Sequence, residues 1–99
     1  MDRVFDALAS APRRQILREL SAGARHTSEL AARFAISAPA ISRHLSVLEN
    51  AGLVASRRDG QRVLYALVRD TLMEALSGFA AELAMGAEPA PPKRRREAI

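Results

Sequence analysis

The sequence predicts a mainly α-helical fold with one small β-hairpin, in which four helices precede the hairpin and one follows it. Two observations support this prediction. Apolar residues recur every three or four positions before residue 51 and after residue 70, which is the spacing of helices that bury one face. Residues 53–67 instead contain two β-prone runs around Asp59-Gly60, and Asp-Gly in that setting is the strongest short-range signal for a hairpin.

The first two helices are expected to be short and amphipathic. Residues 3–9 carry the apolar residues of the first helix, Val4, Phe5 and Leu8. Ser10 is a suitable N-cap for the second helix, and Pro12 falls in the first turn, where a missing N–H removes no hydrogen bond. The second helix is expected to end at Gly23, because glycine readily adopts the conformation that follows many helices.

A helix-turn-helix is predicted next. Thr27 is expected to cap a short third helix, and Ala35-Ile36 forms a tight turn after it. Ser37 is then expected to cap a fourth helix, which ends at Gly52. A short helix, a turn of about three residues and a second helix form a helix-turn-helix, whose second helix can lie in the major groove of DNA.

The exposed face of the fourth helix is unusual because its side chains are small. Ile41, Leu45 and Leu48 mark the buried face. The opposite face carries small residues and one arginine, namely Pro39, Ala40, Ser42, Arg43 and Ser46. A face of small side chains lets a large partner approach closely. The major groove tolerates such a face, and Arg43 is able to donate two hydrogen bonds to guanine or to hold a phosphate.

The hairpin is expected to follow the helix-turn-helix as a wing. Its strands are predicted at residues 53–56 and 62–67, joined by the loop Arg57-Arg58-Asp59-Gly60-Gln61. An arginine-bearing hairpin directly after a helix-turn-helix makes a winged helix. Its arginines are expected to contact phosphates or the minor groove, which positions a protein on DNA more than it reads sequence.

The last helix is expected to begin at Asp70 or Thr71 and to end at Gly86. Its apolar stripe contains Leu72, Met73, Leu76, Phe79 and Leu83. Because the helix is terminal, we expect this stripe to pair with a second subunit across a two-fold axis and not merely to cover the core of its own subunit. Residues 86–99 have no hydrophobic period and are predicted to be a disordered basic tail rich in Pro and Ala, so the folded domain spans residues 1–85.

Composition narrows the class of protein. The chain has 99 residues, a formal net charge of +4 and no cysteine, which suits a single domain with a polyanionic partner and no disulfide or thiolate metal site. No apolar run approaches the roughly 18 residues of a membrane span. The N-terminus lacks a signal-peptide pattern, so a cytoplasmic protein is expected. The chain also lacks a glycine-rich phosphate loop and a Ser–His–acid arrangement, so no enzyme is predicted.

Three segments in the same order resemble ArsR-type winged-helix repressors. They are residues 8–17, residues 37–54 around the fourth helix, and residues 58–67 in the hairpin. The resemblance implies a homodimeric bacterial transcriptional repressor, with a dimer interface built from its first and last helices and a near-palindromic operator. Half-sites are then expected about one helical turn, roughly 10 bp, or a small multiple of it apart.

Departures from the family pattern concern metal binding. Metal sensors of this family carry a cysteine motif in the helix before the recognition helix, whereas residues 27–33 contain none. Others use Asp and His along the last helix, where Asp70, Glu74 and Glu82 occur without any His after residue 44. Carboxylates alone make a poor transition-metal site. The chain is therefore similar to the metal-independent branch of SdpR-type autorepressors, and no cofactor is expected.

The candidate DNA-binding residues come from the helix-turn-helix and the wing. Those expected on the base side are Ser37, Ala38, Ala40, Ser42 and Arg43. Those expected on the backbone side are Thr27, Ser28, Arg57, Arg58, Gln61 and Arg62. The candidates for the dimer interface are Val4, Phe5, Leu8, Leu72, Met73, Leu76, Phe79 and Leu83.

The two histidines and the tail each have more than one interpretation. His44 either contacts phosphate, binds an inducer or senses pH, or it is a partly packed residue of the helix. His26 is either a phosphate contact or an inert loop residue. The run from Lys93 to Arg96 either adheres to DNA or is simply solvated.

The leading prediction is a sequence-specific transcriptional repressor that binds double-stranded operator DNA as a homodimer, without metal. Two alternatives remain open at this point. One is a winged helix that uses the same faces to bind a partner protein, and the other is a DNA repressor released by a small ligand.

Overall fold

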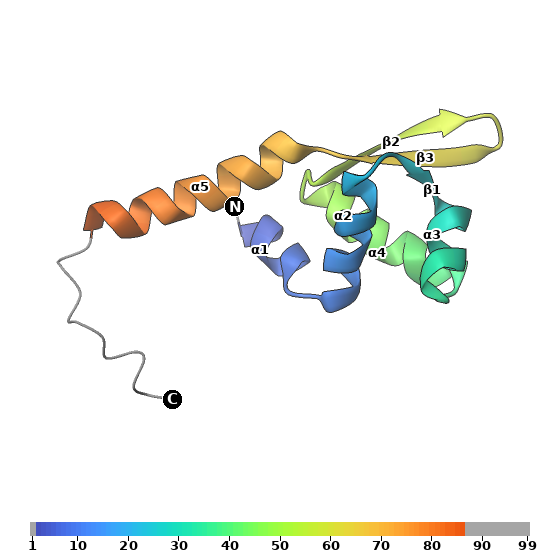
Figure 1. The fold of residues 1–99 in the computed structure, drawn as a ribbon, viewed down its shortest axis with the longest axis horizontal. Helices are drawn as coiled ribbons and strands as arrows, with labels where there is room; N and C mark the ends of the chain where they lie inside the picture. Colours follow the sequence, from blue (N-terminus) through green and yellow to red (C-terminus); the bar gives the residue numbers. More distant parts are fainter. Residues whose placement is uncertain (1, 87–99) are drawn as a thin grey trace.

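The computed structural model describes residues 2–86, which form five helices and a three-stranded sheet (Figure 1). The elements are α1 (Asp2–Leu8), α2 (Ala11–Ser21), β1 (Arg25–His26), α3 (Thr27–Phe34), α4 (Ala38–Asn50), β2 (Val54–Asp59), β3 (Arg62–Leu67) and α5 (Arg69–Gly86). This order confirms the predicted winged helix-turn-helix. Of the predicted tail, residues 86–99, Gly86 is the last residue of α5 and the others lie outside the described residues. No helix in the described part combines the length and apolar composition that a membrane crossing needs.

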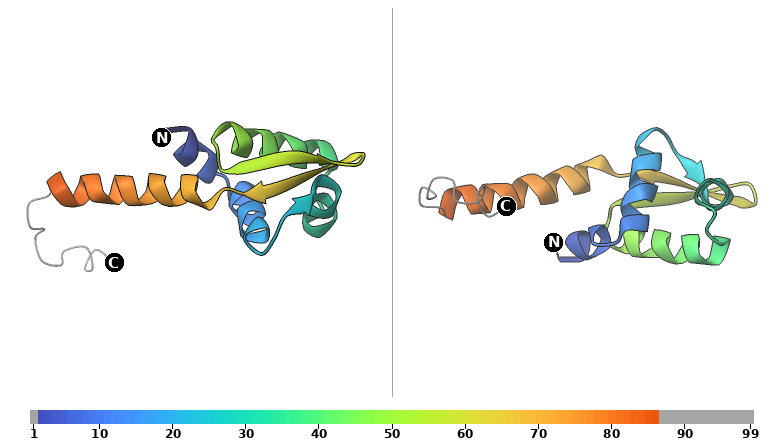
Figure 2. Two further views of the ribbon diagram at one scale, coloured as in Figure 1. Left: turned by 90° about the horizontal axis from the view of Figure 1, so that it is seen from above. Right: turned by 60° about the horizontal axis from the view of Figure 1, so that its bottom comes forward.

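The hairpin and the last helix project from opposite ends of the globular part. The β2–β3 hairpin extends from one end and α5 from the other (Figure 1). Two further views show the tip of the hairpin beside the N-terminal end of α4, and α1 near α5 (Figure 2). The hairpin therefore lies next to the helix-turn-helix, while the first and last helices lie together at the other end.

The sheet corrects two expectations about the wing. Strands β2 and β3 are antiparallel and pair from Val54↔Leu67 to Asp59↔Arg62, so Arg57 and Arg58 lie within a strand and not in the loop. The ladder continues to the turn because Gly60 adopts a φ of +67°, which glycine tolerates without strain. Strand β1 was not expected, since two residues are too few to show a period. It exists because it pairs with β3 along its other edge.

Capping residues set the ends of α2 and α4. The Oγ of Ser10 accepts a hydrogen bond from the Arg13 N–H at 3.4 Å, and the Oγ of Ser37 accepts one from the Ala40 N–H at 3.3 Å, which confirms both predicted caps. At the end of α4, Gly52 has a φ of +78°. The backbone N–H of Leu53 donates to the Leu48 carbonyl at 2.9 Å, as in a Schellman motif.

Two helix starts differ slightly from prediction. Thr27 is the first residue of α3 and not its cap, because His26 occupies the N-cap position. The backbone N–H of His26 donates to Oε1 of Glu29 at 2.6 Å, which fixes the entry of the chain into the helix. Helix α5 begins at Arg69, just before the expected Asp70 or Thr71.

The core is aliphatic and orients the helix-turn-helix. Its largest fully buried side chains come from α2, α3, α4 and the residue before β2, and are Ile16, Leu30, Ile41, Leu45, Leu48 and Leu53. The predicted buried face of α4 is confirmed, since all three of its residues are 0% exposed. Burial of each such side chain contributes roughly 1.5–3 kcal/mol. This packing fixes which face of α4 is presented to solvent.

Candidate nucleic-acid interface

The exposed face of α4 carries mostly small side chains and, near its middle, the charged Arg43. The base-side candidates Ser37, Ala38, Ser42 and Arg43 are exposed, and Ala40 is half-exposed. Ser37 caps the start of α4, and the small side chains that follow it leave the helix backbone accessible. A helix with this face can approach a flat or grooved partner more closely than one covered by long side chains.

A hollow of about 330 Å³ separates the helix-turn-helix from the hairpin. It brings together six of the predicted DNA-binding residues, which are Thr27, Ser28, Ala38, Ser42, Gln61 and Arg62. His26 and Val63 complete its lining. One wall therefore comes from the N-terminal ends of α3 and α4, and the other comes from the tip of the hairpin.

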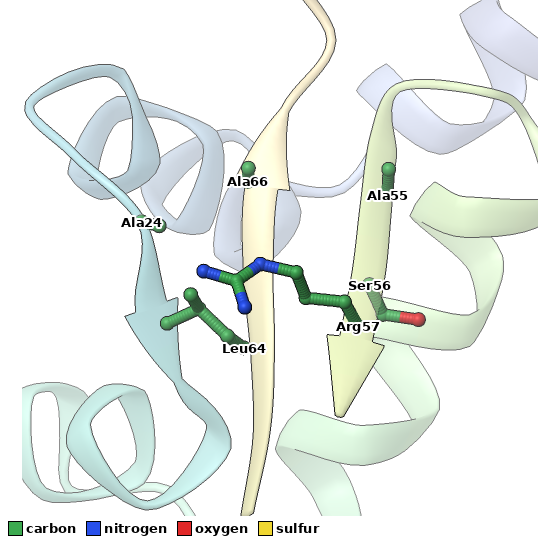
Figure 3. Close-up of a pocket in the computed structure, with 6 residues that line it drawn as sticks. All are labelled: Ala24, Ala55, Ser56, Arg57, Leu64 and Ala66. Atoms are coloured by element: carbon green, nitrogen blue, oxygen red, sulfur yellow. The ribbon is translucent and has the colours of Figure 1, made fainter. Parts of the chain in front are cut away.

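The two arginines of β2 lie on opposite faces of the hairpin. Successive side chains of a strand alternate, so Arg58 shares a face with Ser56. Ser56 Oγ donates to Oε2 of Glu49 on α4 at 2.8 Å, which places this face toward α4. Arg57 is on the other face and reaches across β3 over Leu64, beside a hollow of about 270 Å³ (Figure 3). Arg57 therefore lies on the opposite face from Arg58, and on the same face as Arg62.

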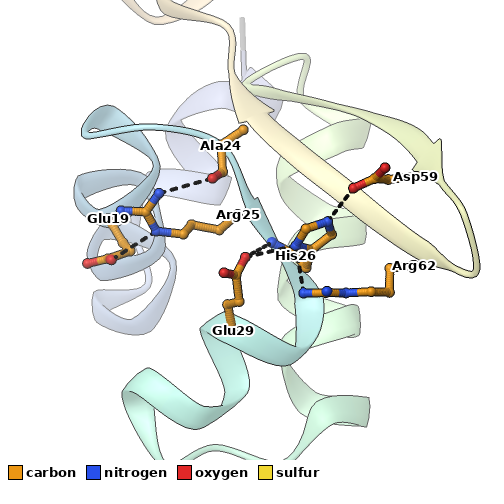
Figure 4. Close-up of polar contacts among 7 residues, drawn as sticks. All are labelled: Glu19, Ala24, Arg25, His26, Glu29, Asp59 and Arg62. Atoms are coloured by element: carbon orange, nitrogen blue, oxygen red, sulfur yellow. Dashed lines mark hydrogen bonds and ion pairs between the residues drawn. The ribbon is translucent and has the colours of Figure 1, made fainter.

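His26 lies at the centre of a polar cluster that joins α3 to the hairpin (Figure 4). Its Nε2 is 2.7 Å from Oδ2 of Asp59, at the end of β2. Its Nδ1 is 2.9 Å from Oε1 of Glu29 and 2.8 Å from a guanidinium nitrogen of Arg62. The His26 side chain is 16% exposed. Sequence reasoning missed this role, because Asp59 is 33 positions away and no local pattern marks the contact.

His26 also affects the charge of the two carboxylates. The hydrogen bond from its backbone N–H, followed by the contact with its ring, holds the pKa of Glu29 below the usual 4.5. The side-chain hydrogen bond to His26 holds the pKa of Asp59 below the usual 3.8. Both carboxylates are therefore charged at neutral pH, and both serve as acceptors for the cluster.

His44 faces the core side of α4 and not the hairpin. It is half-buried, and its Nδ1 is 3.5 Å from a guanidinium nitrogen of Arg13 on α2. The same guanidinium donates to the carbonyls of Ala7 at 2.8 Å and Asp6 at 3.2 Å, which caps the end of α1. Burial, together with the positive charges of Arg13 and Arg43, lowers the pKa of His44 below 6.5.

The apolar stripe of α5 is largely exposed in a single protomer. Met73 is 58% exposed, Leu76 42%, Phe79 44% and Leu83 60%. Phe79 packs edge-on against Phe5 of α1, with ring centroids 5.4 Å apart, so the two helices form one continuous surface. Leu8 and Leu72 are partly buried at its base. Val4 differs from the other dimer candidates, because it is only 6% exposed and belongs to the core of its own protomer.

Metal-ligating side chains are dispersed in the described part of the chain. Residues 2–86 contain no group of three or more His, Asp or Glu side chains placed to hold a metal ion. The nearest approach to such a group is the His26 cluster, where Arg62 brings a positive charge within hydrogen-bonding distance of the imidazole.

A family model and a curated relative match most of this domain. The model described as bacterial regulatory protein, arsR family, matches residues 11–56, which run from α2 into β2. The transcriptional repressor SdpR of Bacillus subtilis (strain 168) is 35% identical over 77 residues, covering 78% of this chain and 86% of SdpR.

Two solved structures share the fold. The crystal structure of an ArsR family transcriptional regulator matches with a TM-score of 0.78 and 26% sequence identity, covering 89% of this chain and 97% of that chain. The solution structure of a homodimeric winged helix-turn-helix DNA-binding domain from Mycobacterium bovis matches with a TM-score of 0.70 and 30% identity, covering 91% of this chain and 85% of that chain.

Proposed function

This chain belongs to the ArsR family of bacterial regulatory proteins, and we propose that it is a repressor that binds a near-palindromic operator as a homodimer, without metal. Membership of the family makes it a DNA-binding regulator of transcription and not an enzyme. Repression is proposed because SdpR, which it resembles over most of its length, is a transcriptional repressor. Occupation of the operator would then exclude RNA polymerase from the promoter.

The proposal rests on the exposed face of α4 around Ala38, Ser42 and Arg43, which lies beside the hollow. This surface is called the bare face of α4. Ser42 and Arg43 are exposed on α4, and Ser42 also lines the hollow. In this arrangement α4 enters the major groove, with Arg43 directed at guanine or phosphate. The walls of the hollow supply hydroxyl, amide and guanidinium groups, which are suitable donors for the phosphates at the edge of the groove.

Dimerisation is proposed through the surface formed by α1 and α5. Five large apolar side chains of α5 are exposed in the protomer, namely Met73, Leu76, Phe79, Leu83 and Met85. An exposed apolar surface of this kind marks a protein interface. A second copy is the proposed occupant, since the related Mycobacterium bovis domain is homodimeric. Two-fold pairing would present two copies of α4 to half-sites about 10 bp, or a small multiple of that, apart.

Metal independence is proposed from the chemistry of the available donors. Asp70, Glu74 and Glu82 of α5 are carboxylates without a neighbouring imidazole, since His26 lies in the hairpin cluster and His44 against Arg13. Transition metals that act as signals bind thiolate and imidazole more readily than isolated carboxylates. The residues of α5 therefore do not fit a zinc-type sensor site, and no step of DNA release is assigned to a metal.

Selection of bound sequences from a random pool of duplex DNA tests the proposal. The full chain is expected to enrich one inverted repeat, to sediment as a dimer, and to bind the selected duplex equally with a chelator or with added zinc. Enrichment of no sequence would contradict operator binding and favour a protein-interaction module. Enrichment of a single half-site by a monomer would contradict the dimer, and release by zinc would contradict metal independence.

A further inference from the structure

The outer end of the hairpin depends on little backbone pairing. Strand β1 pairs with β3 only as far as His26↔Leu64, so the third strand supports the hairpin up to that point. Beyond it, the pairs Arg58↔Val63 and Asp59↔Arg62 form a two-stranded ribbon. A two-stranded ribbon alone is marginally stable in water. Additional contacts are needed to hold the tip in one position relative to the helices.

The His26 side chain supplies such contacts at the last pair. His26, Leu64, Asp59 and Arg62 share one face of the sheet, because directly paired residues lie on the same side. From the end of β1, the ring extends toward the tip and contacts both members of the final pair, at 2.7 Å and 2.8 Å. The backbone of β1 thus supports the hairpin as far as Leu64, and the side chain of His26 extends this support to the last pair.

The ring lies between partners of both charges. Nε2 of His26 donates to Oδ2 of Asp59, because an ionised carboxylate only accepts hydrogen bonds. Nδ1 lies between Oε1 of Glu29, at 2.9 Å, and a guanidinium nitrogen of Arg62, at 2.8 Å. Glu29 receives the backbone N–H of His26 and lies beside the guanidinium. The carboxylates of Glu29 and Asp59 therefore both contact the ring.

His26 also belongs to the helix-turn-helix. It is the N-cap residue of α3, and its backbone is tied to Glu29 in the first turn of that helix. One residue therefore joins the two walls of the hollow: the wall with Thr27 and Ser28, and the wall with Gln61 and Arg62.

We propose that His26 is a positioning residue for DNA binding, which holds the wing at a fixed distance from α3 and α4 before DNA arrives. This inference rests on the proposed function, because it concerns the same interface. Binding gains from order that exists in the free protein, since less conformational entropy is lost when the complex forms. His26 itself need not touch DNA, and its effect is transmitted through Asp59 and Arg62.

Two amide substitutions separate this role from general stability. In His26→Gln, the amide nitrogen reaches about as far as Nε2 and is able to donate to Asp59. In His26→Asn, the side chain reaches only as far as Nδ1, so its amide still reaches Glu29 and Arg62 but loses the link to Asp59. Both variants keep a polar residue at the N-cap of α3, and both are expected to remain folded.

The first measurement uses the free protein and needs no DNA. ¹⁵N relaxation of the amides of Gly60 and Gln61 is expected to report a more mobile tip in His26→Asn and a tip like that of wild type in His26→Gln. An unchanged tip in His26→Asn would show that the link does not hold the hairpin. Thermal unfolding of each variant confirms that the remainder of the domain is intact.

The second measurement is affinity for the selected duplex. His26→Asn is expected to bind about tenfold more weakly, since a hydrogen bond to a charged group contributes roughly that factor, and His26→Gln is expected to bind within about threefold of wild type. Asp59→Ala should weaken binding similarly, and the double variant His26→Asn with Asp59→Ala should be no weaker than either alone. Additive losses, or full affinity of His26→Asn with a mobile tip, would overturn the positioning role.

The two measurements distinguish failure of this inference from failure of the proposed function. If wild type enriches no duplex, the proposed function fails, and the positioning role fails with it even if relaxation confirms the link. If wild type binds its duplex and both His26 variants match it, the proposed function stands and this inference alone is wrong.

Discussion

Arg58 is the arginine of the wing that is best placed to neutralise a phosphate. It is exposed, and it lies on the face of β2 that also carries Ser56, which is bonded to Glu49 of α4 at 2.8 Å. Replacement of Arg58 by Ala removes this charge without disturbing the core, because residues 55–60 of the hairpin are all exposed. We therefore expect the protein to remain folded and to lose one ionic contact per subunit.

The size of the effect follows from counterion release. Each phosphate contact contributes about 0.9 to the slope of log K against log salt concentration, and a homodimer carries Arg58 twice, so the variant should have a slope shallower by about 1.8. Between about 50 and 200 mM salt, wild type should then lose roughly tenfold more affinity than the variant.

Fluorescence anisotropy with the selected duplex across a salt series measures this slope. Arg18→Ala is the matched control, because Arg18 is an exposed arginine of α2 that lines a hollow between α2 and α5, away from the wing. The control should keep the wild-type slope. A slope for Arg58→Ala equal to that of wild type would refute the contact between the wing and the DNA backbone.

Four further outcomes are expected. Arg43→Ala should cost about 1–3 kcal/mol and relax discrimination at one base position, measured by affinity for single-base variants of the operator; equal weakening on all sequences would make Arg43 a phosphate contact. Leu45→Ala should lower the free energy of unfolding by about 2–5 kcal/mol in urea denaturation, because Leu45 is 0% exposed; a loss below about 1 kcal/mol would contradict the packing of α4. Leu83→Glu should produce a monomer in sedimentation with unchanged helix content, since Leu83 is 60% exposed and its burial is needed only in the dimer; a dimer of wild-type strength would move the interface elsewhere. Burial, together with Arg13 and Arg43, holds the pKa of His44 below 6.5, so the unfolded chain binds a proton there more readily and the stability of the fold falls as pH drops from 6.5 toward the lowered pKa. His44→Asn should flatten this part of the profile of stability against pH, measured by urea denaturation. An unchanged profile would show that the pKa of His44 is not lowered by folding.

Local signals predicted the helices and the caps of α2 and α4, but not the cap of α3. Ser10 and Ser37 precede an apolar period of three and four, and both bond the backbone N–H three residues on, as caps do. The buried face through Ile41, Leu45 and Leu48 was also predictable, because a helix of known phase leaves only one face for the core. The family was identifiable because three such segments occur in one order.

Long-range contacts were not predictable in the same way. Strand β1 exists only because β3 passes beside it, and its two residues carry no period of their own. The separation of Arg57 from Arg58 depends on the register of β2, which extended further toward the turn than expected. Val4 was expected at an interface, but the packing of α1 buries it within the protomer. The link from His26 to Asp59 depends on the pairing of β1 with β3 and on the register of β2.

The affinity of Ser42→Glu for the selected duplex shows whether α4 docks on DNA. Ser42 is exposed on the bare face of α4, and a glutamate there places negative charge against the groove in both subunits. Gln15→Glu, on the exposed side of α2, adds the same charge elsewhere and is the control. Ser42→Glu is expected to stay folded and to bind at least about a hundredfold more weakly, since like charges brought together cost several kcal/mol. Equal affinity of the two variants would contradict docking of α4 on DNA.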